Sequence, residues 1–217
     1  AALRGKSLDS LISTDLGGFT RQPLYTQDAM TQANAAGLPG FAPYTRGARA
    51  VNDKFLPWQI AQRLTPGRKG SDQKALMTDL NGGVSAIMLD FSQQLPTLAQ
   101  LDALLNDVML DIAPLSANLA AHGMQAAELI VSLREKRGLA SEITGFLNLD
   151  PLSAHVRYGT ARDIDMSRLV SIGQSHDGLR LMTASGATWH DLGASVVQEL
   201  AWVAASITEY LRQFDAA

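Results

Sequence analysis

The arrangement of apolar and polar residues changes at about residue 72, and a regular alternation follows. Short apolar runs are typical of strands, and they predict strands at 84–91, 110–115, 143–149 and 179–184. Apolar residues that recur every three or four positions predict helices near 97–107, 124–137, 166–174 and 196–214. Strands that alternate with helices indicate a parallel sheet with helical crossovers, so the predicted fold class is α/β. Pro114 then belongs at the end of its strand, because proline cannot donate to a central ladder.

The last predicted helix has the clearest periodicity in the chain. Its apolar residues fall on one face, which we expect to be buried. They are Val196, Val197, Leu200, Val203, Ala204, Ile207, Leu211 and Phe214. Trp202 and Tyr210 lie on the same helix, and at this spacing aromatic side chains are more often packing residues than functional ones.

Residues 1–70 lack such a pattern. Proline and glycine interrupt them repeatedly, as in the stretch at 37–43, and both residues break helices and strands. We predict an extended arm with two short helices, near 26–36 and 58–64. The expected organisation is therefore an arm at 1–70 followed by an α/β domain at 71–217.

The composition of the 217 residues narrows the classes of function. Apolar residues make up 46% and charged residues 18%, which is ordinary for a globular protein. The absence of cysteine excludes disulfides, thiolate metal sites and a cysteine nucleophile, and it fits a cytoplasmic protein. The net charge of −3 gives no general attraction to nucleic acid or anionic lipid, and no apolar run is long enough to cross a membrane. We therefore expect neither nucleic acid nor a membrane as a partner.

Few residues suggest chemistry on their own. The sequence has no phosphate-binding, dinucleotide-binding, zinc-protease or nucleophile-elbow motif. The four histidines are dispersed without metal-ligand spacing, so we expect no metal site. Asp163 and Asp165 could form a cation pair, but the simpler role for one of them is to cap the following helix. His190 is the best placed, since it follows the fourth predicted strand, although a histidine that only orients the turn fits equally well.

Several short motifs along the chain resemble one known family. The N-terminal part contains P-L-Y-T at 23–26, L-P-G at 38–40, Y-T-R-G at 44–47 and P-W-Q-I at 57–60. The C-terminal part contains H-D-L-G-A-S at 190–195, Q-E-L-A at 198–201 and E-Y-L-R at 209–212. Each motif is short, but together they span nearly the whole chain, and in this order they resemble the methylmalonyl-CoA mutases.

This resemblance implies a fold and an activity that the periodicity does not reach. Members of the family bind acyl-CoA in a (β/α)8 barrel and adenosylcobalamin in a separate C-terminal domain, and they interconvert methylmalonyl-CoA and succinyl-CoA by a radical route. The α/β domain would then be half of a (β/α)8 TIM-type barrel, with about four parallel strands. A complete barrel takes about 250 residues, so we expect the chain to be part of a longer subunit. Many bacterial members pair a catalytic large subunit with a small subunit that has lost the active site.

Two departures from the family pattern indicate the small subunit. Counting back from the P-W motif, the catalytic tyrosine position holds Asp53, and the arginine before that motif is replaced by Leu56. Counting back from Gly193, the catalytic histidine position holds Thr188, whereas His190 lies only three residues before that glycine. An aspartate does not reproduce the phenol of the family's tyrosine, and a threonine does not reproduce the imidazole of its histidine. The resemblance therefore implies a non-catalytic chain.

The same comparison gives expectations for ligands. Residues 188–193 resemble the end of the cobalt-ligand motif D-x-H-x-x-G, but Thr188 replaces the aspartate that orients the ligating histidine. We therefore expect no cofactor and no cobalamin-binding domain in this chain, and adenosylcobalamin in the partner subunit. Tyr44, Arg46 and His190 are the candidate residues of a vestigial substrate site, and no residue is assigned a catalytic role.

Three hypotheses follow from these observations. In the first, the chain is a non-catalytic part of a cobalamin-dependent mutase that supports the catalytic large subunit in a heterodimer. In the second, it is a catalytic acyl-CoA mutase fragment with an altered substrate. In the third, it is an unrelated α/β domain that binds a small molecule, and the motifs match by chance.

Overall fold

The computed structural model describes residues 3, 5–27, 29, 37–52, 58–69, 72–160 and 164–217. The chain divides into two units. The first unit consists of Ala1–Trp58 and Ser195–Val197, and the second of Gln59–Ala194 and Gln198–Ala217. The second unit contains the parallel sheet, whereas the α/β domain was expected to begin at 71.

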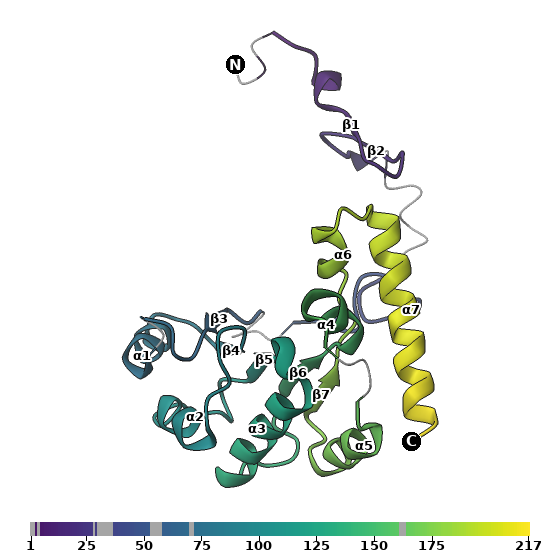
Figure 1. Cartoon of the computed structure of the whole chain (residues 1–217). Coiled ribbons are helices and arrows are strands. Elements are labelled where there is room, and N and C mark those ends of the chain that lie inside the picture. Colours follow the sequence, from purple (N-terminus) through teal and green to yellow (C-terminus); the bar gives the residue numbers. More distant parts are fainter. Residues whose placement is uncertain are drawn as a thin grey trace. The chain divides into compact units, whose positions relative to one another are not determined.

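A five-stranded parallel sheet forms the centre of the second unit (Figure 1). Its strands follow the order of the chain: β3 (Ala61–Leu64), β4 (Ala86–Asp90), β5 (Leu115–Asn118), β6 (Gly145–Leu149) and β7 (Leu179–Met182). Parallel strands in sequential order, joined by helices, are the arrangement of a (β/α) barrel. The predicted α/β class and the partial barrel are confirmed, with one strand more than the four that were predicted.

The additional strand, β3, replaces a predicted helix. Residues near 58–64 were expected to be helical, but Ala61–Leu64 pairs with Ala86–Leu89 of β4. The carbonyl of Ile60 also accepts hydrogen bonds from the backbone of Ser85 and Ala86. Four residues are too few for a periodicity to separate helix from strand, and pairing with a distant segment decides the outcome.

The second predicted strand is displaced along the chain. It was expected at 110–115, but β5 begins at Leu115, and Leu110 and Ala113 are buried in the preceding loop. Pro114 lies just before the strand, where its carbonyl accepts a hydrogen bond from Ile87. A proline can accept at this point but cannot donate, so β5 starts only after it.

Seven α-helices and one short 3-10 helix (Ala120–His122) are described in this part of the chain. They are α1 (Gln73–Asn81), α2 (Leu98–Leu104), α3 (Gly123–Lys136), α4 (Pro151–Tyr158), α5 (Met166–Ser175), α6 (Ala187–Asp191) and α7 (Val196–Asp215). α2, α3, α5 and α7 confirm the four predicted helices, whereas α1, α4 and α6 were not predicted. The cap expected before α5 is confirmed, because the side chain of Asp165 accepts a hydrogen bond from the backbone of Arg168 at 2.9 Å.

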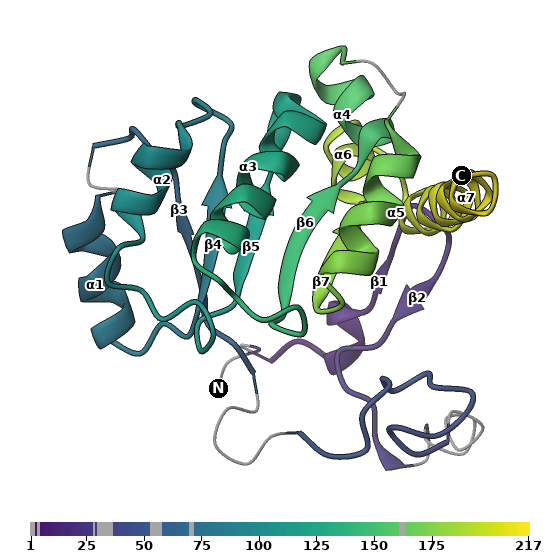
Figure 2. The same cartoon turned by 90° about the horizontal axis from the view of Figure 1, so that it is seen from below.

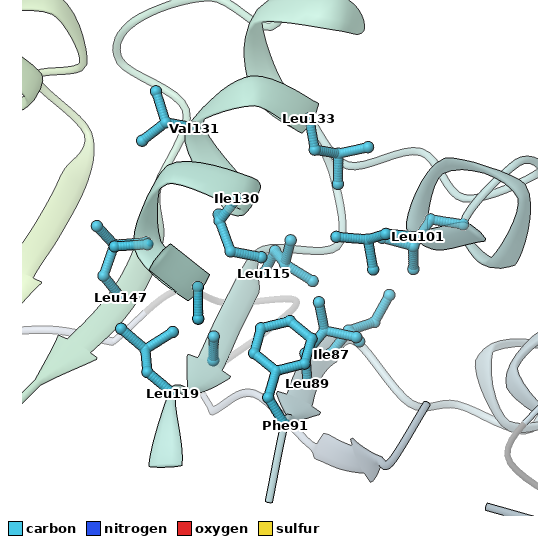
Figure 3. Close-up of a cluster of buried hydrophobic side chains, with 14 of the residues drawn as sticks. Ile87, Leu89, Phe91, Leu101, Leu115, Leu119, Ile130, Val131, Leu133 and Leu147 are labelled. Atoms are coloured by element: carbon cyan, nitrogen blue, oxygen red, sulfur yellow. The ribbon is translucent and has the colours of Figure 1, made fainter. Parts of the chain in front are cut away.

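The hydrophobic core lies between the sheet and four helices on one side of it (Figure 2). α1, α2, α3 and α5 cover this face, and the side chains of α2 and α3 meet those of β4, β5 and β6 (Figure 3). Ile87, Leu89, Leu101 and Leu147 are fully buried there. Each such side chain stabilises the fold by about 1.5–3 kcal/mol relative to an exposed position.

The apolar face predicted for the last helix is not the buried one. Leu200 is 65% exposed, and Ile207 and Leu211 are also exposed. The buried positions are Ser206 and Tyr210, while Val203 and Phe214 are half-buried. A hydrophobic stripe shows that a helix has a face suited to contact, but it does not identify what lies against that face.

The two aromatic residues of α7 are packing residues, as predicted. Tyr210 is 5% exposed. Trp202 packs on Trp189 of α6, with 3.8 Å between the ring centroids. The contact between Trp189 and Trp202 joins α6 and α7 within the second unit.

The described part of the first unit contains no buried residue. It holds a short 3-10 helix (Leu8–Leu11) and an antiparallel hairpin of β1 (Ser13–Thr14) and β2 (Thr20–Arg21). Asp15 organises the hairpin, since its side chain accepts hydrogen bonds from the backbone of Gly17 and Phe19. Most of the helix predicted near 26–36 lies outside the described residues.

Candidate functional site

A pocket of about 610 Å³ opens at the carboxyl ends of β5, β6 and β7. Its walls come from the loop after β5, from α4, and from the segment between β7 and α6, which lie close together in Figure 1. Ligand pockets in proteins commonly have volumes of about 300–1,000 Å³, and (β/α) barrels place their sites at this end of the strands. We therefore take this pocket as the candidate site.

Beside the pocket, a chain of polar side chains crosses the ends of β3, β4 and β5. Arg63 donates from Nε to Asp90 at 2.7 Å, and Asn118 donates to the other oxygen of Asp90 at 2.9 Å. Ser92 donates to the same carboxylate from its backbone and its hydroxyl. Burial raises the pKa of Asp90, but the hydrogen bonds from Arg63 and Ser92 outweigh it and lower the pKa below its usual value. Asp90 is therefore a fixed anion that joins three strands rather than a general base.

Asp150, which lies in the wall of the pocket, accepts three hydrogen bonds. Its Oδ1 accepts from the hydroxyl of Tyr210 at 2.6 Å and from the backbone of Ser153 at 3.1 Å. Its Oδ2 accepts from the backbone of Ser185 at 2.9 Å. Burial and the neighbouring carboxylate strongly raise the pKa of Tyr210, so this phenol stays protonated. The group joins α4, α7 and the segment after β7.

Arg157 of α4 lines the pocket, and its guanidinium carries a full positive charge. It donates to Thr188 Oγ1 at 3.3 Å and to Asp191 at 2.6 Å. A guanidinium has five N–H donors, so these two contacts leave others available. The side chain of Asp191 is mostly exposed and does not line the pocket.

Two further polar side chains line the pocket. His122 is half-buried, and its ring makes no hydrogen bond to a described residue. The hydroxyl oxygen of Thr160 is buried and has no partner among the described residues. The backbone carbonyl of Thr160 accepts a hydrogen bond from Nδ1 of His155 at 2.6 Å. These groups can bind a ligand, but they form no nucleophile–base pair of the kind that covalent catalysis requires.

The three residues predicted for a vestigial substrate site belong to different units of the chain. Tyr44 and Arg46 are exposed residues of the first unit, in the loop where Gly47 donates to the carbonyl of Tyr44. His190 belongs to the second unit and does not line the pocket. A substrate-binding role for these residues stays a prediction.

His190 lies within α6 rather than in the predicted loop. Its side chain is 72% exposed and pairs with Glu199 through Nδ1 at 2.8 Å. The hydrogen bond that His190 donates to Glu199, together with the negative charge of that carboxylate, raises the pKa of His190. Thr188, which the motif resemblance predicts to occupy the position of the family's catalytic histidine, is 6% exposed and lines the pocket. Asp53 and Leu56 lie outside the described residues.

Arg157, Asp150 and Thr160 line the pocket, but none of them was predicted as a site residue. Asp150 follows a predicted strand directly, and this position is a usable signal in a barrel. Arg157 and Thr160 lie on and just after α4, which was not predicted, so nothing placed them near the strand ends.

No cluster of three or more potential metal ligands occurs among the described residues. In the same part of the chain, no helix is both long enough and apolar enough to span a membrane.

Comparison with known proteins identifies the family. The sequence profile described as methylmalonyl-CoA mutase matches residues 14–103. The methylmalonyl-CoA mutase small subunit of Streptomyces virginiae is 33% identical over 215 residues, which cover 96% of this chain and 34% of that protein. The probable small subunit of Mycobacterium tuberculosis is 29% identical over 217 residues, covering 98% and 35%.

The family also includes proteins named simply as the mutase. The methylmalonyl-CoA mutase of Escherichia coli is 23% identical over 248 residues, covering 96% of this chain and 34% of that protein. The chain therefore spans about a third of the length of the relatives it matches. On these matches, the chain belongs to the methylmalonyl-CoA mutase family and is more similar to the small subunits named above than to this mutase.

Proposed function

We propose that the chain is part of the non-catalytic small subunit of an adenosylcobalamin-dependent methylmalonyl-CoA mutase. It supports the catalytic large subunit, which interconverts methylmalonyl-CoA and succinyl-CoA. The observation that carries this proposal is the difference in identity, 33% to a relative named small subunit against 23% to one named mutase.

The surroundings of Thr188 support a non-catalytic role. This residue stands where the family's catalytic histidine is expected, and its hydroxyl accepts a hydrogen bond from Arg157. A threonine hydroxyl does not titrate near neutral pH, so it cannot act as the general acid or base that an imidazole provides. His190, two residues later, is engaged by Glu199 on the surface.

The residues at 188–193 do not fit a cobalt site. A ligating histidine needs a second group that orients its other ring nitrogen, usually a carboxylate. Glu199 does contact Nδ1 of His190, but the motif's own aspartate position is Thr188, which is buried and bonded to Arg157. We therefore propose that adenosylcobalamin binds to the partner subunit.

The arm supports a role in binding a partner. Large apolar side chains in the described part of the first unit stay exposed, among them Leu16 at 89% and Phe19 at 60%. Asp15 fixes the turn that carries both, through its bonds to the backbone and an ion pair with Arg21. A rigid turn that displays apolar side chains is suited to docking on another protein, because little conformational freedom is lost on binding.

The test is to mix the chain with the catalytic large subunit from the same source. We expect a stable complex in size-exclusion chromatography at micromolar concentration. The chain alone, with methylmalonyl-CoA and adenosylcobalamin, should show no turnover. Turnover by the chain alone would support the catalytic-fragment hypothesis instead, and absence of a complex would remove the proposal.

A pair of variants locates the contact. Leu16→Ser together with Phe19→Ser should weaken the complex, because both side chains would lose apolar contact area. Met109→Ser is the matched control, since Met109 is 61% exposed on the second unit. Equal weakening by the control would show that the arm has no special part in binding.

A further inference from the structure

His176 is a buried titratable side chain that does not line the pocket. It directly follows α5, and only 7% of it is exposed. Its Nδ1 is buried and has no hydrogen-bond partner among the described residues. A neutral imidazole carries one N–H donor, whereas the protonated ring carries two and a positive charge. Burial without partners therefore penalises the protonated ring more than the neutral one.

A second buried group, Arg134 of α3, acts on this ring through its charge. Arg134 is 2% exposed, and its Nε also has no partner among the described residues. One of its terminal nitrogens donates to the backbone carbonyls of Ala140 and Ile143, at 3.5 and 2.8 Å. Those carbonyls are neutral and do not cancel the charge of the guanidinium. A protonated His176 would therefore meet a like charge in a buried place, where water screens the repulsion poorly.

Two further charged side chains act on His176. Glu135 of α3 has a carboxylate oxygen 4.0 Å from Nε2 and favours the protonated ring, but its side chain is 63% exposed and water weakens the attraction. Arg168 of α5 opposes protonation. Burial has the largest effect, followed by Arg134, and the pKa of His176 is lowered below its ordinary value of 6.5.

The backbone of His176 joins α5 to the start of β7. Its N–H donates to the carbonyl of Ile172, and its own carbonyl accepts from Leu179, the first residue of β7, both at 2.9 Å. The loop after α3 and the turn before β7 carry Glu142 and Asp177, whose side chains are exposed. A charge on the ring of His176 would therefore act at the junction between α5 and β7.

We propose that His176 is an acid-sensitive switch at the junction between the carboxyl end of α5 and the start of β7. While the ring is neutral, it stays buried and the junction is closed. Protonation drives the ring toward water, and the junction opens. The amino end of α5 stays in place, because Arg168 pairs there with Glu128 of α3, the neighbouring helix on the covered face of the sheet (Figure 2). The switch lies wholly within the second unit.

Hydrogen exchange at single backbone amides of the 217-residue chain tests this switch. Between about pH 7.5 and about pH 5.5, the opening constants at His176 and Leu179 should rise about three- to tenfold after correction for intrinsic exchange, because a proton bound only in the open state changes them by at most about tenfold per pH unit. Carboxylates stay ionised in this range and do not contribute.

Leu169, at the amino end of α5, is the internal control. Its amide donates to the carbonyl of Asp165, and its opening constant should change by less than about twofold. An equal rise at Leu169 would mean that acid destabilises the whole unit, and it would overturn the switch. An unchanged opening constant at Leu179 would overturn it as well.

Two variants assign the effect to one side chain. His176→Gln is neutral at every pH, so the pH dependence of opening at Leu179 should disappear. His190→Gln is the matched control, because it removes an exposed histidine, and the pH dependence at Leu179 should remain. Persistence of the dependence in His176→Gln, or its loss in His190→Gln, would contradict the assignment.

A titration of the unmodified chain completes the test without any variant. In nuclear magnetic resonance spectra, the ring signals of His176 should titrate below pH 6.5, whereas those of His190 should titrate above it. A ring of His176 that titrates at or above 6.5 would overturn the proposal, whatever the exchange rates show.

Discussion

Tyr210 donates the hydrogen of its phenol to Asp150 at 2.6 Å, although 60 residues separate the two along the chain. The same hydroxyl accepts a hydrogen bond from the backbone of Leu152 at 3.3 Å. Asp150 also caps α4, so a single pair fixes both the start of α4 and the position of α7.

Removing this hydroxyl should destabilise the second unit. Tyr210→Phe keeps the ring but loses a hydrogen bond to a charged group and leaves the Asp150 oxygen with one donor fewer. We expect the free energy of unfolding to fall by about 1.5–3 kcal/mol, measured by urea denaturation. Tyr158→Phe is the matched control, because Tyr158 is exposed, and it should change stability by less than about 0.5 kcal/mol. Equal effects of the two variants would contradict the role of the pair.

The exposed apolar stripe of α7 makes a second prediction. Leu200→Ser should alter the free energy of unfolding by less than about 0.5 kcal/mol, because Leu200 is exposed. Leu89→Ala, in the core, should cost about 2–5 kcal/mol in the same measurement. A large loss in Leu200→Ser would mean that the stripe is buried, as its periodicity alone had suggested.

Asp90 should make the free energy of unfolding depend on pH in the acidic range. Its folded pKa lies below the usual value of about 3.9, so its ionic contribution is present above that pH and is lost as the pH falls through the folded pKa. The stability advantage of the natural protein over Asp90→Asn should therefore be largest near neutral pH and shrink below about pH 4. Urea unfolding across this range tests it, with Arg63→Gln expected to give the same profile. A difference that stays constant with pH would refute the assignment.

The contribution of His190 to stability should change with pH in the opposite direction to that of Asp90. Its folded pKa is raised by Glu199, so the contribution of the pair is complete below the ordinary pKa of about 6.5 and disappears as the pH rises through the folded pKa. The effect should be small, because the side chain is exposed. Thermal unfolding of the natural protein and of His190→Gln should differ at pH 5 and converge above about pH 8. Glu199→Gln should behave like His190→Gln, and a difference that grows with pH would rule out this role.

The elements that could be predicted are those with a local signal. α3 and α7 were predicted because each repeats an apolar pattern over several turns. β6 and β7 were predicted because apolar runs lie between helices. β3 was not, since its four residues become a strand only through pairing with β4, and no window of the sequence contains that partner.

The candidate site was harder to predict than the fold. Position after a strand singled out His190, but the structure places this residue on the surface of α6. Arg157 and Thr160 reach the pocket because α4 turns back over the strand ends, which is a tertiary arrangement. Thr188 was identified by its position in a family motif, and the structure adds that it contacts Arg157.

Asn148 shows how a torsion angle can limit which residues a position tolerates. Between Phe146 and Leu149, β6 contains one residue more than the matching part of β7, and Asn148 has a φ of 52° within this bulge. Its side chain donates to the carbonyl of Ala117 at 3.0 Å. A β-branched residue, normally favoured in strands, is excluded here by the backbone, and glycine would fit the backbone but lose the bond. Few residue types can therefore replace Asn148 during evolution. A ranking of substitutions by strand propensity would place the excluded β-branched residues first.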